Sequence, residues 1–252
     1  MVQIPPFRER LLRGDLLVGT MITLTAPEVA EIMAGVGFDW LFVDAEHGAF
    51  EAREIQALLQ AAGPTTPGVV RVSTAAEVLI KKALDVGAAG IIAPQINTAE
   101  QAADVVRLAK YAPAGSRGVG IARAHGYGLR LPEYVQTANE RVAVIVQAEH
   151  IEAVRNIEAI VRVPGIDAVL VGPYDLSASM GKVGQVEDAE VRQAIDRVTA
   201  ACRDAGVRLG IFGVSTAAVK PYIDQGYTLI VAGVDTIMLG QAAQGMLAEL
   251  KK

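Results

Sequence analysis

The sequence predicts a (β/α)8 barrel, in which a closed ring of parallel strands is surrounded by the helices that follow them. The chain has 252 residues, close to the roughly 250 residues that such barrels use as one domain. Short apolar runs alternate with helical patterns from one end to the other. The composition, 52% hydrophobic but only 5% aromatic, favours strands buried under helices over an aromatic-rich β-sandwich.

Eight runs of mostly consecutive apolar residues predict the strands. Barrel strands are covered on both faces, so they read as continuous apolar stretches and not as apolar and polar residues in alternation. No linker or break in composition divides the chain, so we expect one domain over residues 1–252. The expected strands span residues 16–22, 40–43, 68–72, 90–93, 142–147, 168–171, 208–212 and 228–231.

Helical patterns fill the intervals between these strands. Three of them begin with the spacing of a capping box, in which a threonine hydroxyl accepts from the backbone three residues on and that residue's side chain returns the bond; the pairs are Thr25 and Glu28, Thr74 and Glu77, and Thr98 and Gln101. Glycines suited to a left-handed turn end five helices: Gly37, Gly63, Gly87, Gly206 and Gly226. The expected helices span residues 27–36, 52–61, 75–86, 99–109, 151–161, 187–205, 217–225 and 235–250.

An open, doubly wound sheet is the alternative that this alternation leaves open. Such a sheet usually binds a dinucleotide at a glycine-rich first turn. The first turn of this chain, residues 23–25, reads Thr-Leu-Thr and has no glycine. The repeat of strand and helix therefore favours the barrel.

Charge and cysteine content exclude several classes of function. The formal net charge is −5 and the pI is about 5.3, and no run of basic residues exceeds two, so no nucleic-acid partner is expected. One cysteine, Cys202, cannot form an intrachain disulfide, and its helical context indicates a core thiol. No signal-like segment and no run of roughly 18 apolar residues is present, so we expect a cytoplasmic protein without membrane contact.

Two carboxylates at the ends of consecutive strands point to a metal site. Glu149 follows the fifth expected strand and Asp175 the sixth. Neighbouring strands lie about 4.8 Å apart, so both side chains can converge on one cation, and oxygen ligands suit Mg²⁺ or Mn²⁺. The alternatives are that Glu149 caps the next helix and that Asp175 forms a salt bridge.

Arg71 ends the third expected strand and is the candidate anion-binding residue. A planar guanidinium at this position suits a carboxylate or a developing enolate. A structural ion pair with Glu46 or Asp44 is the alternative.

His47 lies three residues after Asp44, behind the second expected strand. If the turn brings them together, the carboxylate would orient the imidazole as a general base; the alternative is a histidine on a surface loop. The other two histidines, His125 and His150, are expected to be supporting or solvated. No lysine falls on an expected strand, which disfavours a Schiff-base mechanism and makes a metal the expected electron sink.

Seven motifs together carry a resemblance to a known family. The chain resembles the metal-dependent (class II) pyruvate aldolases of the 4-hydroxy-2-oxoheptanedioate / 2-keto-3-deoxy-sugar-acid aldolase family, which is related to citrate lyase β-subunits. The motifs run in the family's order over most of the chain: residues 43–48 (VDAEHG), 70–72 (VRV), 94–101 (PQINTAEQ), 113–118 (PAGSRG), 147–149 (QAE), 172–177 (GPYDLS) and 233–235 (GVD).

The resemblance implies reversible cleavage of a 4-hydroxy-2-oxo acid to pyruvate and an aldehyde. It implies that Glu149 and Asp175 bind Mg²⁺, Mn²⁺ or Co²⁺, which pyruvate chelates, and that Arg71 stabilises the enolate. It further implies that proton transfer uses His47 and Asp44. The residues implied in positioning the pyruvate are Gln147, Gly172, Pro173 and Tyr174.

The resemblance also implies a homo-oligomer, a hexamer, in which the helix over residues 235–250 is exchanged with or packed on a neighbouring subunit. Gln95 and residues 21–24 depart from the family's pattern, and with Phe212 they are expected to reshape the aldehyde pocket. Two rival functions remain. A CoA-thioester lyase of the citrate or malyl-CoA type would need a basic groove for the nucleotide, which the sequence does not indicate. A non-catalytic barrel would only bind an oxo acid.

Overall fold

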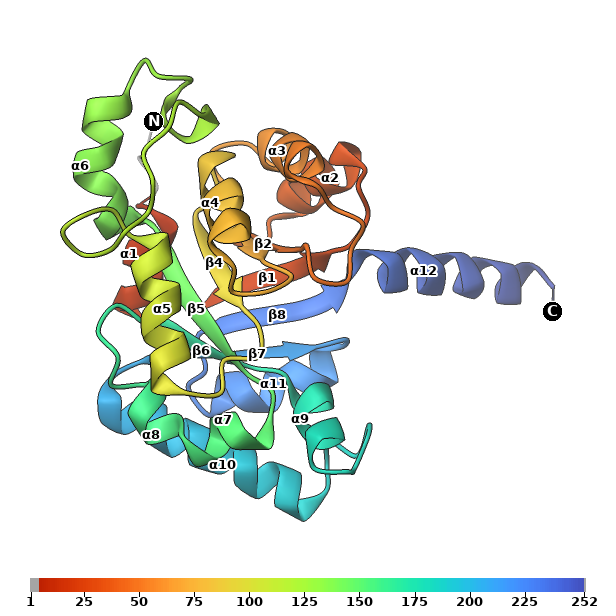
Figure 1. Cartoon of the computed structure of the whole chain (residues 1–252). Coiled ribbons are helices and arrows are strands. Elements are labelled where there is room, and N and C mark those ends of the chain that lie inside the picture. The colour runs from red at the N-terminus through yellow and green to blue at the C-terminus, as the bar shows by residue number, and fades with distance from the viewer. Residues whose placement is uncertain (1–4, 252) are drawn as a thin grey trace.

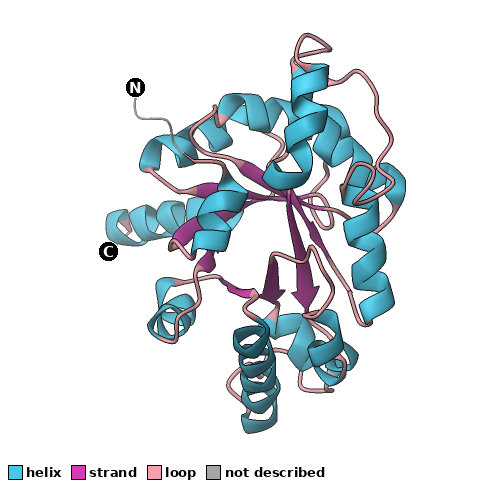
Figure 2. Cartoon of the chain, turned by 90° about the vertical axis from the view of Figure 1, so that its left-hand side faces the viewer, coloured by secondary structure: helices cyan, strands magenta, loops and turns pink. Residues whose placement is uncertain are grey.

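The computed structural model describes residues 5–251 and confirms the predicted barrel. Eight parallel strands close into one ring in the order of the sequence, with β8 paired to β1, and helices surround them (Figure 2). The doubly wound alternative is therefore excluded. The strands are β1 Leu17–Ile22, β2 Trp40–Asp44, β3 Gly68–Arg71, β4 Gly90–Ala93, β5 Ala143–Ala148, β6 Ala168–Val171, β7 Arg208–Gly213 and β8 Leu229–Val234.

Most helices lie between consecutive strands, as expected, and α12 projects away from the barrel (Figure 1). The helices are α1 Phe7–Arg13, α2 Pro27–Val36, α3 Ala52–Ala61, α4 Glu77–Asp85, α5 Ala99–Ala109, η1 Arg123–His125, α6 Leu131–Arg141, α7 Ile151–Arg155, α8 Ile157–Ile160, α9 Pro173–Ser179, α10 Ala189–Ala205, α11 Thr216–Asp224 and α12 Asp235–Leu250. No helix in the described part of the chain is long and apolar enough to cross a membrane.

Three α-helices and the 3-10 helix η1 were not predicted, and one predicted helix is divided. The short helices α1, α6 and α9 each bury only one or two side chains, so they have no apolar stripe for a sequence pattern to reveal. The predicted helix over residues 151–161 breaks at Asn156, whose side-chain amide donates to the carbonyl of Asn97 (2.8 Å). This bond ties the break between α7 and α8 to the loop before α5.

Of the three predicted capping boxes, one is confirmed and two are wrong. Thr98 accepts from the Gln101 N–H, and the Gln101 side chain accepts from the Thr98 N–H. The helices after Thr25 and Thr74 start one or two residues later, behind Ala26 and Ala76, without a side-chain cap. All five glycines predicted to end helices have positive φ.

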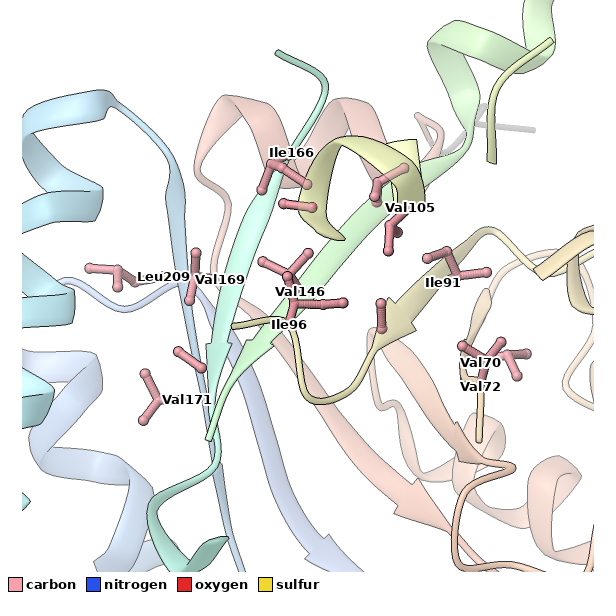
Figure 3. Packing of buried hydrophobic residues seen from close by; sticks show 14 of the residues in the cluster. Val70, Val72, Ile91, Ile96, Val105, Val146, Ile166, Val169, Val171 and Leu209 are labelled. Carbon is pink, nitrogen blue, oxygen red and sulfur yellow. The ribbon is translucent and has the colours of Figure 1, made fainter. Parts of the chain in front are cut away.

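Two apolar layers stabilise the barrel. The outer layer fills the space between strands and helices, where Val146, Val169 and Ile91 pack under α5 and its neighbours (Figure 3), and it includes the fully buried Cys202. The inner layer fills the barrel itself around Trp40. A Cβ on Gly19 would come within 2.6 Å of the Trp40 indole, so only glycine lets the two strands carry this ring between them.

Candidate active site

A cavity of about 400 Å³ lies at the carboxyl ends of the strands, where barrel enzymes hold their chemistry. It is lined by Met21, Thr23, Phe42, Asp44, His47, Arg71, Gln147, Leu170, Gly172, Tyr174, Asp175, Phe212 and Val214. A larger hollow of about 960 Å³ lies beside α1 and α6. It lies at the opposite, amino ends of the strands, where Pro67, Ala89 and Val142 precede β3, β4 and β5, so the smaller cavity is the candidate site.

Arg71 is held by two carboxylates and still lies in the cavity wall. Its Nε and Nη2 donate to the two oxygens of Asp44 (both 2.8 Å), and its Nη1 lies 3.1 Å from Glu46 and 3.5 Å from the Gln147 side-chain oxygen. The predicted alternative, an ion pair with Asp44 or Glu46, is confirmed with both. Nη1 is the guanidinium nitrogen that does not bond to Asp44, so it is the one that a ligand in the cavity would meet.

Burial lowers the pKa of Arg71, but the hydrogen bonds and negative charge of Asp44 outweigh it and leave that pKa above its ordinary value. The guanidinium also lies 5.3 Å from the centre of the Phe42 ring. Arg71 is therefore a fixed, permanent positive charge in this wall.

Glu149 is a buried carboxylate without a basic partner among the described residues. Its Oε1 accepts from the backbone N–H of Gln95 (2.8 Å) and its Oε2 from the Gln147 side-chain amide (2.6 Å). The predicted alternative, that Glu149 caps the next helix, is wrong, because His150 caps α7 through its Nδ1. A Cβ on Gly172 would come within 3.2 Å of the Glu149 Oε2, so glycine makes room for the carboxylate at this position.

The environment of Glu149 favours a bound cation. Burial, together with the charges of Glu46 and Asp175, raises its pKa from 4.5 to about 7, although the Gln95 N–H and the charge of Arg71 lower it. Asp175, in the first turn of α9, has no salt-bridge partner in the part of the chain that the structure describes. Four carboxylates thus lie near the single guanidinium of Arg71, and a divalent cation would neutralise the excess negative charge. They are those of Asp44, Glu46, Glu149 and Asp175.

The protein supplies only part of the ligand set that a hard metal ion needs. Within residues 5–251, no group of three or more histidine, cysteine, aspartate or glutamate side chains is arranged to hold a metal. Glu149 and Asp175 would supply two oxygens, and water and substrate would complete the shell, as magnesium sites often require.

His47 does not form the pair that the sequence suggested. Its imidazole is 72% exposed, and its Nε2 lies 3.9 Å from a Glu46 oxygen. From His47, Asp44 accepts a hydrogen bond only from the backbone N–H (3.5 Å) and none from the imidazole, because both Asp44 oxygens bind Arg71. Glu46, expected from the sequence only as a possible partner of Arg71, connects the guanidinium with the imidazole. Because Glu46 lies in the same motif as Asp44 and His47, that motif was the signal that could have indicated this role.

The remaining candidate residues divide between the wall and the rim of the cavity. Gln147 and Phe212 lie in the wall, and Tyr174 is 59% exposed at the rim. Pro173 begins α9 and does not line the cavity. His125, expected to be supporting or solvated, is buried and binds the backbone of its own loop through both ring nitrogens.

A charged cavity at the carboxyl ends of a closed barrel defines the protein as a TIM-barrel enzyme. The chain belongs to the HpcH/HpaI aldolase/citrate lyase family, whose model matches residues 18–242. It is a carbon–carbon lyase, an aldolase.

Two curated relatives and one solved structure illustrate the family. The chain is 39% identical to the 4-hydroxy-2-oxo-heptane-1,7-dioate aldolase of Shigella sonnei, over 96% of this chain and 93% of that protein. It is 38% identical to the hydroxypyruvate/pyruvate aldolase of Paraburkholderia phytofirmans, over 98% and 97%. A family member from Burkholderia cenocepacia has a TM-score of 0.93 at 39% identity, covering 97% of this chain and 98% of that one.

These relatives bear on the two rival functions predicted from the sequence. Neither curated relative is named as a CoA-thioester lyase or as a binding protein. The comparisons therefore favour the aldolase over both rivals.

Proposed function

We propose that this enzyme reversibly cleaves 4-hydroxy-2-oxo acids to pyruvate, or a related 2-oxo acid, and an aldehyde. The observation that carries the proposal is that Arg71 and Gln147 line the cavity, while Glu149 lies buried directly behind Gln147 and Gly172. A 2-oxo acid presents two neighbouring oxygen groups to such a wall. Relatives named as aldolases for 4-hydroxy-2-oxo-heptane-1,7-dioate and for hydroxypyruvate and pyruvate support this substrate class.

Glu149 and Asp175 would hold the divalent cation, Mg²⁺, Mn²⁺ or Co²⁺, for the reasons of charge and burial given above. When bound, the cation supplies Lewis acidity at the 2-oxo and carboxylate oxygens of the substrate. Gln147 keeps the Glu149 carboxylate in place through its 2.6 Å bond, while the backbone at Gly172 leaves room beside it.

Cleavage breaks the C3–C4 bond of the substrate. The C4 hydroxyl loses its proton and becomes the carbonyl of the aldehyde, while the electron pair of the broken bond passes to C3 and gives the enolate of pyruvate. Protonation of C3 then releases pyruvate. Arg71 would donate through Nη1 to the 2-oxo oxygen, where negative charge develops.

His47 would accept the proton of the C4 hydroxyl. Its exposed imidazole lines the cavity, with Nε2 3.9 Å from a Glu46 oxygen. The position at the mouth of the cavity, away from Glu149, suits a group that acts on the aldehyde half.

Replacing His47 by alanine is expected to slow cleavage about a hundredfold, the range of one general base, while the exchange of pyruvate methyl protons with solvent stays close to wild type. The measurements are retro-aldol kcat and proton exchange in D₂O by NMR. His150→Ala, at a histidine that caps α7, is the control. An equal loss of both activities would contradict the role given to His47.

A substrate panel tests the proposed function as a whole. A series of 4-hydroxy-2-oxo acids would be incubated with the enzyme, and released pyruvate would be detected by coupling to lactate dehydrogenase. We expect pyruvate release that EDTA abolishes and that Mg²⁺ or Mn²⁺ restores. No pyruvate from any member of the panel, whatever the metal, would overturn the proposal.

We also propose a cytoplasmic homo-oligomer, a hexamer, in which α12 packs on a neighbouring subunit. The helix extends from the barrel (Figure 1) and exposes Leu239, Met246, Leu247 and Leu250, which gives it an apolar surface that a second copy can cover. The free, buried thiol of Cys202 supports a reducing compartment.

Leu247→Glu combined with Leu250→Glu is expected to lower the oligomeric mass seen by sedimentation velocity, because two charges would enter the apolar contact. Lys251→Glu, beside the same helix, is the matched control. A double variant with the mass of the wild type would contradict the placement of α12.

A further inference from the structure

Asp235 is a buried carboxylate that no step of the proposed mechanism uses. It is 2% exposed and begins α12, directly after β8. Its Oδ2 accepts from the backbone N–H groups of Thr23 and Leu24 (both 2.9 Å), and its Oδ1 accepts from the Thr236 N–H (2.8 Å) and the Thr23 hydroxyl (2.6 Å). No arginine or lysine within the described range pairs with it, so these donors and the helix N-terminus alone stabilise its charge.

The partner of Asp235 lies in the cavity wall. Thr23 follows β1 and lines the cavity. In the ring of eight strands β1 lies four places from β5, so Thr23 faces the cavity from the side opposite Glu149. If the 2-oxo acid half lies beside Arg71 and Glu149, the wall at Thr23 adjoins the aldehyde half.

The end of β1 depends on Asp235 for its position. The pairing of β1 with β8 shifts register between Gly19 and Met21, and such an irregularity redirects the residues that follow it. The three bonds from Thr23 and Leu24 to one carboxylate fix the chain directly after this shift. Residues 212 positions apart in the sequence thus shape one wall.

The bond to Asp235 also fixes the polarity of the Thr23 hydroxyl. A carboxylate oxygen can only accept, so the hydroxyl proton of Thr23 points to Oδ1. The hydroxyl of Thr236 lies 3.4 Å away and can use one of the remaining lone pairs. Any further bond between the Thr23 oxygen and a ligand must then have the ligand as donor.

We propose that Asp235, acting through the Thr23 hydroxyl, makes the enzyme select acceptor aldehydes that carry a hydroxyl donor over those that carry a carboxylate. The inference rests on the proposed aldolase function and deepens it to a class of acceptor. A hydroxyl of the aldehyde can donate to the Thr23 oxygen, whereas a carboxylate cannot, because the Thr23 proton is already held by Asp235. Asp235 is a positioning residue, and Thr23 is the residue that meets the substrate.

The test compares aldehydes in the direction of synthesis, with pyruvate and Mg²⁺ as the second substrate and the cofactor. Glycolaldehyde, acetaldehyde and 4-oxobutanoate supply a hydroxyl, no polar group and a carboxylate, respectively. In Thr23→Val the ratio of kcat/KM for glycolaldehyde to that for acetaldehyde is expected to fall about three- to tenfold, the value of one hydrogen bond, mainly through KM. Thr23→Ser is expected to restore the ratio.

Asp235→Asn tests the polarity itself. The side-chain amide would keep its oxygen toward the N–H groups of Thr23 and Leu24, lose the bond from the Thr236 N–H, and turn its nitrogen to the Thr23 hydroxyl, whose proton is then free to donate to a ligand. The ratio of kcat/KM for 4-oxobutanoate to that for glycolaldehyde is expected to rise about tenfold, the value of one charge-assisted bond. A purely structural role would lower both rates together.

Thr25→Val, on the same loop and exposed, is the matched control and is expected to keep all ratios. Exchange of pyruvate methyl protons is expected to stay within about twofold of wild type in every variant, because it needs only the opposite wall. Unchanged ratios in both Thr23→Val and Asp235→Asn, with exchange intact, would overturn the inference and leave the proposed function standing. Absence of pyruvate proton exchange in the wild-type enzyme would overturn both this inference and the proposed function.

Discussion

Replacing Arg71 by lysine is expected to lower kcat about a hundred- to a thousandfold, as the loss of one aligned donor does at a developing negative charge. Lysine keeps the positive charge near Asp44 and Glu46, so the two carboxylates remain neutralised. It lacks the fork that binds both oxygens of Asp44 and still places Nη1, beside Glu46 and Gln147, within reach of the substrate. The measurement is kcat for pyruvate release at saturating substrate and metal.

Arg107→Lys is the matched control, because Arg107 is an exposed arginine on α5 paired with Asp104. It is expected to keep the rate of the wild type. Thermal unfolding of Arg71→Lys would show that the variant is folded under assay conditions. A folded variant with near-normal kcat would mean that the guanidinium only holds Asp44 and Glu46, and would remove Arg71 from the mechanism.

Replacing Glu149 by glutamine is expected to abolish both metal binding and activity. The two side chains have the same shape, so the bond from the Gln95 N–H can be kept, but a neutral amide is a poor ligand for a hard cation. Isothermal titration with Mn²⁺ is expected to show no binding at concentrations that saturate the wild type, and kcat is expected to fall at least about a thousandfold. Normal metal affinity would contradict the assignment.

The same variant is expected to be more stable than the metal-free wild type at high pH. Because burial raises the pKa of Glu149 from 4.5 to about 7, the folded state holds this proton more tightly than the unfolded state. The stabilisation is complete below about pH 4.5 and is lost as pH rises through about 7. Each pKa unit is worth about 1.4 kcal/mol, so the ionised carboxylate costs the metal-free wild type about 3 kcal/mol at pH 8.

Urea unfolding in EDTA at pH 5 and at pH 8 measures this difference. Glu149→Gln is expected to exceed the wild type at pH 8 and to match it near pH 5, whereas Glu31→Gln, at an exposed position on α2, is expected to do neither. Added Mg²⁺ is expected to stabilise the wild type and Glu31→Gln, but not Glu149→Gln. A variant less stable than the metal-free wild type at pH 8 would show that the ionised carboxylate is already well compensated.

Much of the site follows from the sequence once the barrel is predicted. Parallel strands in a closed ring end at the same face, so polar residues that follow consecutive apolar runs must gather there. Arg71, Glu149 and Asp175 were found by this rule alone, and all three adjoin the cavity or its wall. The resemblance added the roles of these residues, which position cannot supply.

Local patterns were less reliable than the periodic ones. The spacing of Thr25 and Thr74 satisfies a capping box, but Pro27 at the first position of α2 and the later start of α4 shift both helices beyond reach of the hydroxyls. Helix α1 has only Phe7 and Leu11 to indicate that it packs on the barrel. Such short elements are stabilised by tertiary contacts, which a local window does not contain.

The sequence by itself determined the barrel, the face that carries the chemistry and the residues at the strand ends. Only the tertiary structure decided which partner each carboxylate takes. Asp44 pairs with Arg71 and not with the imidazole of His47, and Asp235 accepts from Thr23. The physical reason is one of scale. The apolar runs place the ends of seven strands within one residue of the observed ends, and that of β8 within three. A hydrogen bond depends on distances of a few tenths of an ångström between side chains that the folded chain brings together from distant positions.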